Sequence, residues 1–165
     1  MPDDLLLPTS IAMGIVSFAL AARWYAVPRI RHLAVARALE PFLLFHAFRY
    51  VGLAFLITGV TAAPLDPRFA EPAAWGDLLA ALLALASAGM LRVGVRGALA
   101  VAWTFNVVGS VDLINALWQG IRYTPDGHLG ATYFIPAVIV PALLVTHGLM
   151  FWILVRNRRP VGAAV

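Results

Sequence analysis

Residues 132–155 read TYFIPAVIVPALLVTHGLMFWILV, and this stretch decides the fold class because it contains no Asp, Glu, Lys or Arg. An α-helix rises about 1.5 Å per residue, so a helix over this stretch is long enough to cross the roughly 30 Å of membrane hydrocarbon. Four further apolar stretches have similar lengths, at about 8–27, 40–62, 72–95 and 98–119. The sequence therefore predicts an all-α membrane protein, a bundle of five transmembrane helices in a single polytopic domain over residues 1–165.

The overall composition supports this fold class. Hydrophobic residues make up 62% of the 165 residues and charged residues only 12%, with a mean hydropathy of +0.86, whereas globular proteins contain about 25% charged residues. A soluble enzyme is excluded, because the chain lacks the charged surface that keeps such a domain dissolved. The net charge of +4 comes from arginines near the ends of apolar stretches, so the expected partner is the lipid bilayer and not a nucleic acid.

Missing residue types exclude several chemistries. The chain contains no Cys and no Lys, so it cannot form disulfides, thiolate metal sites, cysteine-ligated iron–sulfur clusters or Schiff bases. Its four histidines are too few for the histidine boxes of membrane desaturases. A pair of deep aspartates is not expected either, because Asp77 is interpreted as a charge in the first turn of the third helix. We assign no catalytic residue and no metal ligand, and we do not expect an enzyme.

The arginines also predict the orientation of the bundle. Five spans place the termini on opposite sides, and the positive-inside rule assigns the arginine-rich side to the cytoplasm. Only Arg68 and Arg122 lie on the other side. We expect the N-terminus outside, the C-terminus in the cytoplasm, and a first helix that is retained rather than cleaved. The arginine-rich side contains Arg23, Arg29, Arg31, Arg37, Arg92, Arg96, Arg156, Arg158 and Arg159.

Two local signals indicate where helices begin and turn. Glu40 followed by Pro41 is typical of a helix start, with an acid near the positive helix end and proline in the first turn. The link 92–97 is so short that the third and fourth helices are expected to form an antiparallel hairpin. The abundance of Ala, Arg and Gly without Lys favours a bacterial cytoplasmic (inner) membrane as the location.

Polar residues within the apolar stretches are the candidates for function, since a charge at the bilayer centre costs about 3 kcal/mol or more. Counting a rise of about 1.5 Å per residue from the cytoplasmic ends places polar residues of all five helices in one layer. On the second helix, His46, Arg49 and Tyr50 share a face at spacings i, i+3 and i+4. The layer is expected to contain Ser17, His46, Arg49, Ser87, Thr104, Asn106, Thr146 and His147.

The leading electrostatic hypothesis is an ion pair between Arg49 and Asp112. The fourth helix has two polar strips, one with Asp112 and Asn115 and one with Asn106, so it is expected at the centre of the bundle or at a contact with another subunit. Together with Tyr50, these residues form the candidate ligand or ion site. The pair acts as a proton or ion relay, as a clamp for an anionic ligand, or as a structural pair that fixes helix register.

His46 and His147 carry a second hypothesis. Two histidines on different helices at similar depth are what a six-coordinate b-type haem needs, with Arg37 or Arg156 near the propionates and a bend at Pro141. The alternative interpretation is a pair of core histidines whose nitrogens bind hydroxyl or backbone groups. No other cofactor is indicated.

The third helix has one face of small residues, which allows another helix to approach closely. The approaching helix belongs either to the same chain or to a homo-oligomer or partner membrane subunit. The predicted function is binding or passage of a small ligand or ion, and the alternatives are haem-based electron transfer and a non-catalytic structural subunit of a membrane complex. The small face consists of Asp77, Ala80, Ala81, Ala84, Ser87 and Ala88.

Overall fold

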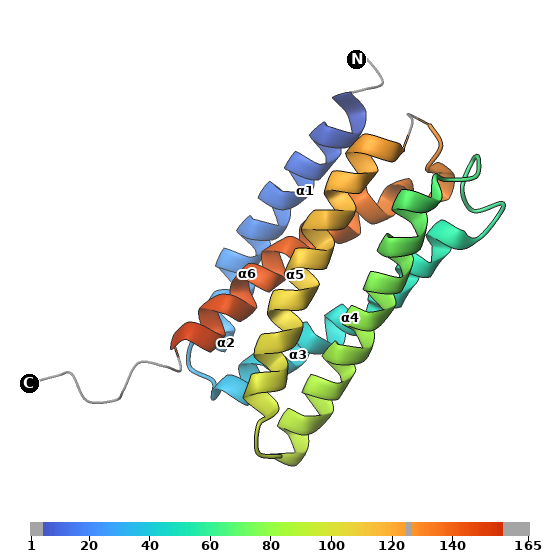
Figure 1. Cartoon of the computed structure of the whole chain (residues 1–165). Helices are drawn as coiled ribbons and strands as arrows, with labels where there is room; N and C mark the ends of the chain where they lie inside the picture. Colours follow the sequence, from blue (N-terminus) through green and yellow to red (C-terminus); the bar gives the residue numbers. More distant parts are fainter. Residues whose placement is uncertain (1–4, 125–126, 157–165) are drawn as a thin grey trace, which may run out of the picture.

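The computed structural model describes residues 5–124 and 127–156, and within them the chain is a bundle of long helices (Figure 1). Five helical spans in this part of the chain are long and apolar enough to cross a membrane, as predicted: Leu6–Ile30, Val35–Leu56, Pro67–Val93, Ala98–Tyr123 and Gly130–Arg156. Apart from an isolated bridge between Thr58 and Thr61, the described residues contain no β structure.

Three of the spans change helix type along their length. The first consists of α1 (Leu6–Ala21), the π-helical turn η2 (Ala22–Ala26) and α2 (Val27–Ile30). The second joins α3 (Val35–Ala47) to the 3-10 helix η3 (Phe48–Leu56). The third and fourth are the continuous helices α4 (Pro67–Val93) and α5 (Ala98–Tyr123). The fifth contains the 3-10 turn η4 (Gly130–Tyr133), the π-helical turn η5 (Ile135–Ile139) and α6 (Val140–Arg156).

The second span does not begin at Glu40 as predicted. Helix α3 begins at Val35, and Pro41 lies inside it. Leu39, one residue before Glu40, is completely buried in the core, and this apolar contact holds the preceding turn in the helix although proline removes one backbone hydrogen bond. Glu40 accepts a hydrogen bond from Arg92 at the end of α4. Its carboxylate therefore binds a neighbouring helix rather than marking a helix start.

The third span also begins earlier than predicted, at Pro67 instead of about residue 72. The side chain of Asp66 accepts a hydrogen bond from the backbone N–H of Arg68 and so caps the helix, with proline in the first position. The Arg68 guanidinium, hydrogen-bonded to the same carboxyl, lowers the pKa of Asp66 to about 2. Asp77 therefore lies about 15 Å along α4, and its interpretation as a first-turn charge was wrong.

The short link between α4 and α5 forms the predicted antiparallel hairpin (Figure 1). Gly94 ends α4 with φ of 75°, and Gly97 precedes α5 with φ of 86°. Both values lie in the left-handed region, which glycine adopts without the steric cost of a Cβ atom. Two glycines three positions apart thus reverse the chain within a few residues.

The first span lies at the periphery, where α1 packs along α6 and η5 (Figure 1). No residue of α1 is fully buried. A Cβ at Gly14 would lie 2.9 Å from the ring of Pro141, so glycine is required for this close approach. The Pro141 ring follows the π-helical turn η5, where proline cannot donate a helical hydrogen bond.

Two apolar clusters form the core and lie on either side of a polar layer. One cluster joins α3, α4, α5 and α6 around Leu43, Ala84, Phe105 and Ile153. The other joins η3, α4, α5 and α6 around residues such as Phe55, Phe69, Leu113 and Leu143. The buried polar residues between them are His46, Arg49, Asp77, Asn106 and His147.

Candidate functional site

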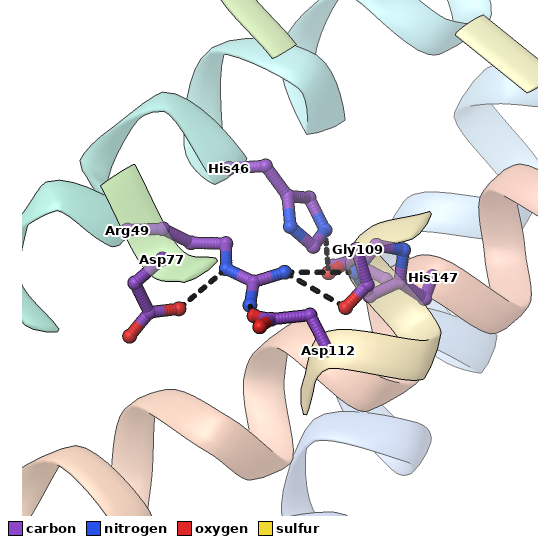
Figure 2. A network of polar contacts seen from close by, with 7 residues as sticks. His46, Arg49, Asp77, Gly109, Asp112 and His147 are labelled. Carbon is purple, nitrogen blue, oxygen red and sulfur yellow. Dashed lines mark hydrogen bonds and ion pairs between the residues drawn. The ribbon is translucent and has the colours of Figure 1, made fainter. Parts of the chain in front are cut away.

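Arg49 is the centre of the polar layer (Figure 2). Its side chain has 0% exposure and reaches acceptors on two other helices. Nε donates to Asp77 Oδ1 at 2.7 Å, and Nη2 donates to Asp112 Oδ2 at 2.6 Å. Nη1 donates to the Gly109 carbonyl oxygen at 3.0 Å. The expected ion pair between Arg49 and Asp112 is present, and Asp77 is a second acidic partner.

The depth of Arg49 follows from the true start of α3. Measured from Val35, Arg49 lies about 21 Å along its span, and Asp112 lies about 21 Å along α5 from Ala98. Counted from the expected start at residue 40, Arg49 would lie only about 13 Å along its span, about 8 Å short of Asp112. With the helix starting at Val35, the Arg49 guanidinium lies at the same depth as both carboxylates. The Arg49 side chain therefore contacts both without extending along the bundle axis.

The 3-10 helix η3 decides which residues beside Arg49 face the interior. A 3-10 helix has three residues per turn, so side chains at i and i+3 lie above one another. Arg49, Gly52 and Phe55 are accordingly the buried residues of η3. Tyr50, expected on the face of His46 from the 3.6-residue period, is 50% exposed and points away. The predicted period was wrong from Phe48 onwards.

Three glycines make room for the charged groups. A Cβ at Gly52 would lie 2.1 Å from Asp77 Oδ2, and one at Gly76 would lie 1.9 Å from Asp112 Oδ1. A Cβ at Gly109 would lie 3.1 Å from Arg49 Nη1. Any larger side chain at Gly52 or Gly76 would displace a carboxylate, so the absence of these Cβ atoms is part of the site.

His147 lies next to Arg49 with its tautomer set by its partners. Its Nδ1 lies 2.7 Å from Asn106 Oδ1, which only accepts, so Nδ1 donates. Its Nε2 lies 3.4 Å from Arg49 Nη1, which only donates, so Nε2 accepts. Asn106 Nδ2 donates to the His147 carbonyl oxygen at 3.4 Å and fixes the amide orientation. The imidazole therefore adds no positive charge to the site in this arrangement.

His46 connects the network to Thr146 of α6. Its Nε2 lies 3.0 Å from Thr146 Oγ1, and the Thr146 hydroxyl lies 2.8 Å from the Ala142 carbonyl oxygen. The hydroxyl proton goes to the carbonyl, so His46 Nε2 donates to Thr146. His46 Nδ1 is buried and has no hydrogen-bond partner among the described residues.

The two histidines do not fit a bis-histidine haem site. Their ring centroids lie 4.2 Å apart, so the rings are in direct van der Waals contact and leave no space for a porphyrin between them. Both nitrogens of His147 already have protein partners.

Several residues of the predicted layer and of the candidate ligand site lie elsewhere. Asn115 is exposed on α5, where its Oδ1 accepts from Gln119 at 3.4 Å. Ser17 and Thr104 are also exposed. Ser87 is completely buried, and its hydroxyl has no hydrogen-bond partner in the described chain. The structure thus brings together Arg49, Asp112 and Asn106 with His46 and His147, and leaves Asn115 and Tyr50 outside the cluster.

Asp77 is the site residue that sequence reasoning missed. The signal was present, because Asp77 shares a helix face with small residues that the structure buries, from Ala80 to Ala88. An acidic group on a buried face requires a partner. The incorrect helix start hid this requirement by placing Asp77 at the end of the helix.

The cluster has an unequal set of charges. One guanidinium contacts two carboxyl groups, and the side chains of Asp77 and Asp112 are only 13% and 19% exposed. Asp77 Oδ2 and Asp112 Oδ1 accept no hydrogen bond from the described residues. With both carboxyls ionised, one negative charge of the cluster is unmatched, and the two remaining carboxylate oxygens pack against Gly52 and Gly76.

A family model matches residues 6–155, and its description is "Domain of unknown function (DUF8737)". Because the match covers nearly the whole chain, the chain belongs to this family. No curated protein and no solved structure matches the chain.

Proposed function

We propose that this member of the DUF8737 family is an integral membrane protein that binds a proton or a small monovalent cation at the Arg49–Asp77–Asp112 cluster and passes it across the bilayer. The observation that carries the proposal is the sharing of one buried guanidinium by two carboxyl groups. An unmatched charge in the middle of a membrane is costly. Binding one positive charge neutralises the cluster.

The charge balance argues against a clamp for an anionic ligand, the other active role predicted for Arg49. Nε and Nη2 each donate to a carboxylate, and Nη1 donates to a backbone carbonyl. An anion would have to displace an aspartate from this guanidinium and would meet a second carboxylate nearby. A cation meets two unoccupied carboxylate oxygens instead.

The charge balance also separates this role from a purely structural one. A structural ion pair needs one acid for each base, and replacing such a pair with apolar residues is often neutral or stabilising. A second buried acid adds desolvation cost and leaves an unmatched charge. We infer that the second acid is retained for binding and not for stability.

The orientation of the protein is part of the proposal. The arginines at the ends of α2, α4 and α6 support a cytoplasmic location for that end of the bundle. The N-terminus then lies outside and the C-terminus inside, in a bacterial cytoplasmic membrane. The partly exposed carboxyl groups of Asp77 and Asp112 lie roughly halfway along their helices and form the midpoint of the pathway.

The test is ion flux into liposomes that contain the purified chain, under an imposed membrane potential. Parallel samples carry a gradient of protons, Na⁺ or K⁺ and a dye sensitive to that ion. We expect flux of one cation above that of empty liposomes. Asp77→Asn and Asp112→Asn should each lower this flux at least about 10-fold, because each removes a carboxylate from the cluster while keeping its size. The matched control is Asp66→Asn, a partly exposed acid that caps α4 outside the cluster, and Asn is an equally good cap.

Folding of each variant is checked by circular dichroism and gel filtration. Flux of protons, Na⁺ and K⁺ equal to that of empty liposomes would overturn passage. Folded Asp77→Asn and Asp112→Asn variants that transport like the Asp66→Asn control would overturn the cluster as the site. Removal of Arg49 is not a useful test, because it leaves two buried carboxylates without a partner and costs about 3–5 kcal/mol of stability.

A further inference from the structure

A second feature lies on the side of the bundle, apart from the Arg49 cluster. It is an open cavity of about 450 Å³ between the first span and α6, with Phe42 of α3 at its base. This volume is in the range of small-molecule sites. The walls are apolar, from residues including Phe18, Tyr25, Val145 and Leu149. Among the lining side chains, Arg29 is the charged one, and Tyr25 and Thr146 carry hydroxyls.

Small residues create this lateral cavity. Ala21, Ala22 and Ala26 of the first span face Ala142 of α6 across it. The π-helical turn η2 covers the same stretch, and a π-helical turn widens the helix locally. The cavity runs along the first span from Phe18 to Arg29, about 16 Å. Its length and apolar walls fit a hydrocarbon chain, which a compact polar solute would not fill.

The charged end of the cavity has no acidic counterpart. Arg29 is exposed and donates to the Tyr25 carbonyl oxygen, and no ion pair joins it to an acid in the described residues. Nearby, Arg156 donates to carbonyl oxygens at the end of α2, including Ile30. Glu40 is an acid toward this end of the bundle, and it binds Arg92. The excess of guanidinium groups is complementary to a phosphate.

We propose that the lateral cavity binds one anionic phospholipid, with its phosphate on Arg29 and one acyl chain along the apolar wall toward Thr146. Anionic lipids attract basic groups at the cytoplasmic leaflet, where the proposed orientation places Arg29. The bound chain would contact Thr146, whose hydroxyl holds His46 in the polar network. None of the cavity's lining residues belongs to the Arg49–Asp77–Asp112 cluster. Lipid binding here therefore does not require that the cluster binds an ion.

The experiment is native mass spectrometry of the full chain in detergent with phosphatidylglycerol, and with phosphatidylcholine of the same acyl chains. We expect one retained phosphatidylglycerol per chain and at least about 10-fold weaker retention of phosphatidylcholine. Arg29→Gln should weaken phosphatidylglycerol retention at least about 10-fold, whereas Arg37→Gln should leave it unchanged. Arg37 is the matched control because it is an exposed arginine of the next span that does not line the cavity.

Two further arms identify the contacts. Ala22→Phe should fill the cavity and abolish retention, and a thermal melt checks that the variant is folded. Glycerol phosphate, which has the head group without the chains, should not bind. If it binds with the same affinity as phosphatidylglycerol, the ligand is a soluble phosphate and the lipid proposal is overturned. Equal retention of both lipids, or equal loss of phosphatidylglycerol in Arg29→Gln and Arg37→Gln, would overturn the proposal. Either result would show that the retained lipid is annular lipid and is not bound at a specific site.

Discussion

At the scale of single residues, the site depends as much on missing side chains as on charged ones. The carboxylates of Asp77 and Asp112 occupy the space that Cβ atoms would take at Gly52 and Gly76. Glycine inside a helix costs about 1 kcal/mol relative to alanine. At these two positions the ion pairs offset that cost, because the close packing brings both acids within hydrogen-bond distance of Arg49.

Gly76→Ala tests this packing. The added methyl group would force the Asp112 carboxylate away from Arg49, so we expect a loss of about 1–3 kcal/mol in the free energy of unfolding. Gly89→Ala is the matched control in the same helix, since a Cβ there meets no atom within 4 Å. It should stabilise the protein by up to about 1 kcal/mol through helix propensity. Urea or thermal unfolding in detergent measures both, and equal stability of the two variants would contradict the packing argument.

At the scale of elements, the change from α3 to η3 positions the arginine. A 3-10 helix usually ends after three or four residues, because its hydrogen bonds have poorer geometry than those of an α-helix. The 3-10 helix η3 continues for nine residues. In this protein it aligns Arg49, Gly52 and Phe55 on the surface of α4. The stretch forms the last nine residues of the second span and begins directly beside the proposed ion site.

Hydrogen exchange should detect this difference between helices. We expect backbone amides of residues 49–56 to exchange faster than those of residues 78–90 in α4, because weaker hydrogen bonds open more readily. Residues 142–150 of α6 serve as a second reference on the buried side of the bundle. The measurement is exchange followed by mass spectrometry in detergent micelles or nanodiscs. Equal protection of η3 and α4 would show that the 3-10 stretch is as stable as an α-helix.

At the scale of the whole molecule, the charged residues form two groups, one at one end of the bundle and one buried within it. Arginines gather at the end of the bundle that contains the α4–α5 hairpin, while the buried charges lie between two apolar clusters. The first distribution supports an orientation in the membrane, and the second supports a site within it. The absence of cysteine from the chain makes the orientation directly testable with single introduced cysteines.

Labelling with a membrane-impermeant maleimide tests the orientation. Ala62→Cys lies in the link between η3 and α4, and Val95→Cys lies in the link between α4 and α5; both positions are exposed. With the N-terminus outside, Ala62→Cys should react in intact cells and Val95→Cys only after permeabilisation. The cysteine-free parent chain is the control for background labelling. The reverse pattern would invert the proposed topology.

The sequence by itself determined the helical class, the five apolar spans, the α4–α5 hairpin and the ion pair of Arg49 with Asp112, because length, hydropathy and the cost of a buried charge are local properties. Tertiary structure alone decided where α3 begins, where η3 changes the helical period, and that Asp77 also binds Arg49. Each depends on packing against another helix: burial of Leu39 extends α3, and close contact with α4 at Gly52 accompanies the tighter helix. The start of α3 and the change of period at η3 depend on contacts between residues far apart in the chain, which leave no periodic signal in the sequence. The small face of α4 does indicate that Asp77 is buried, but it does not identify Arg49 as its partner.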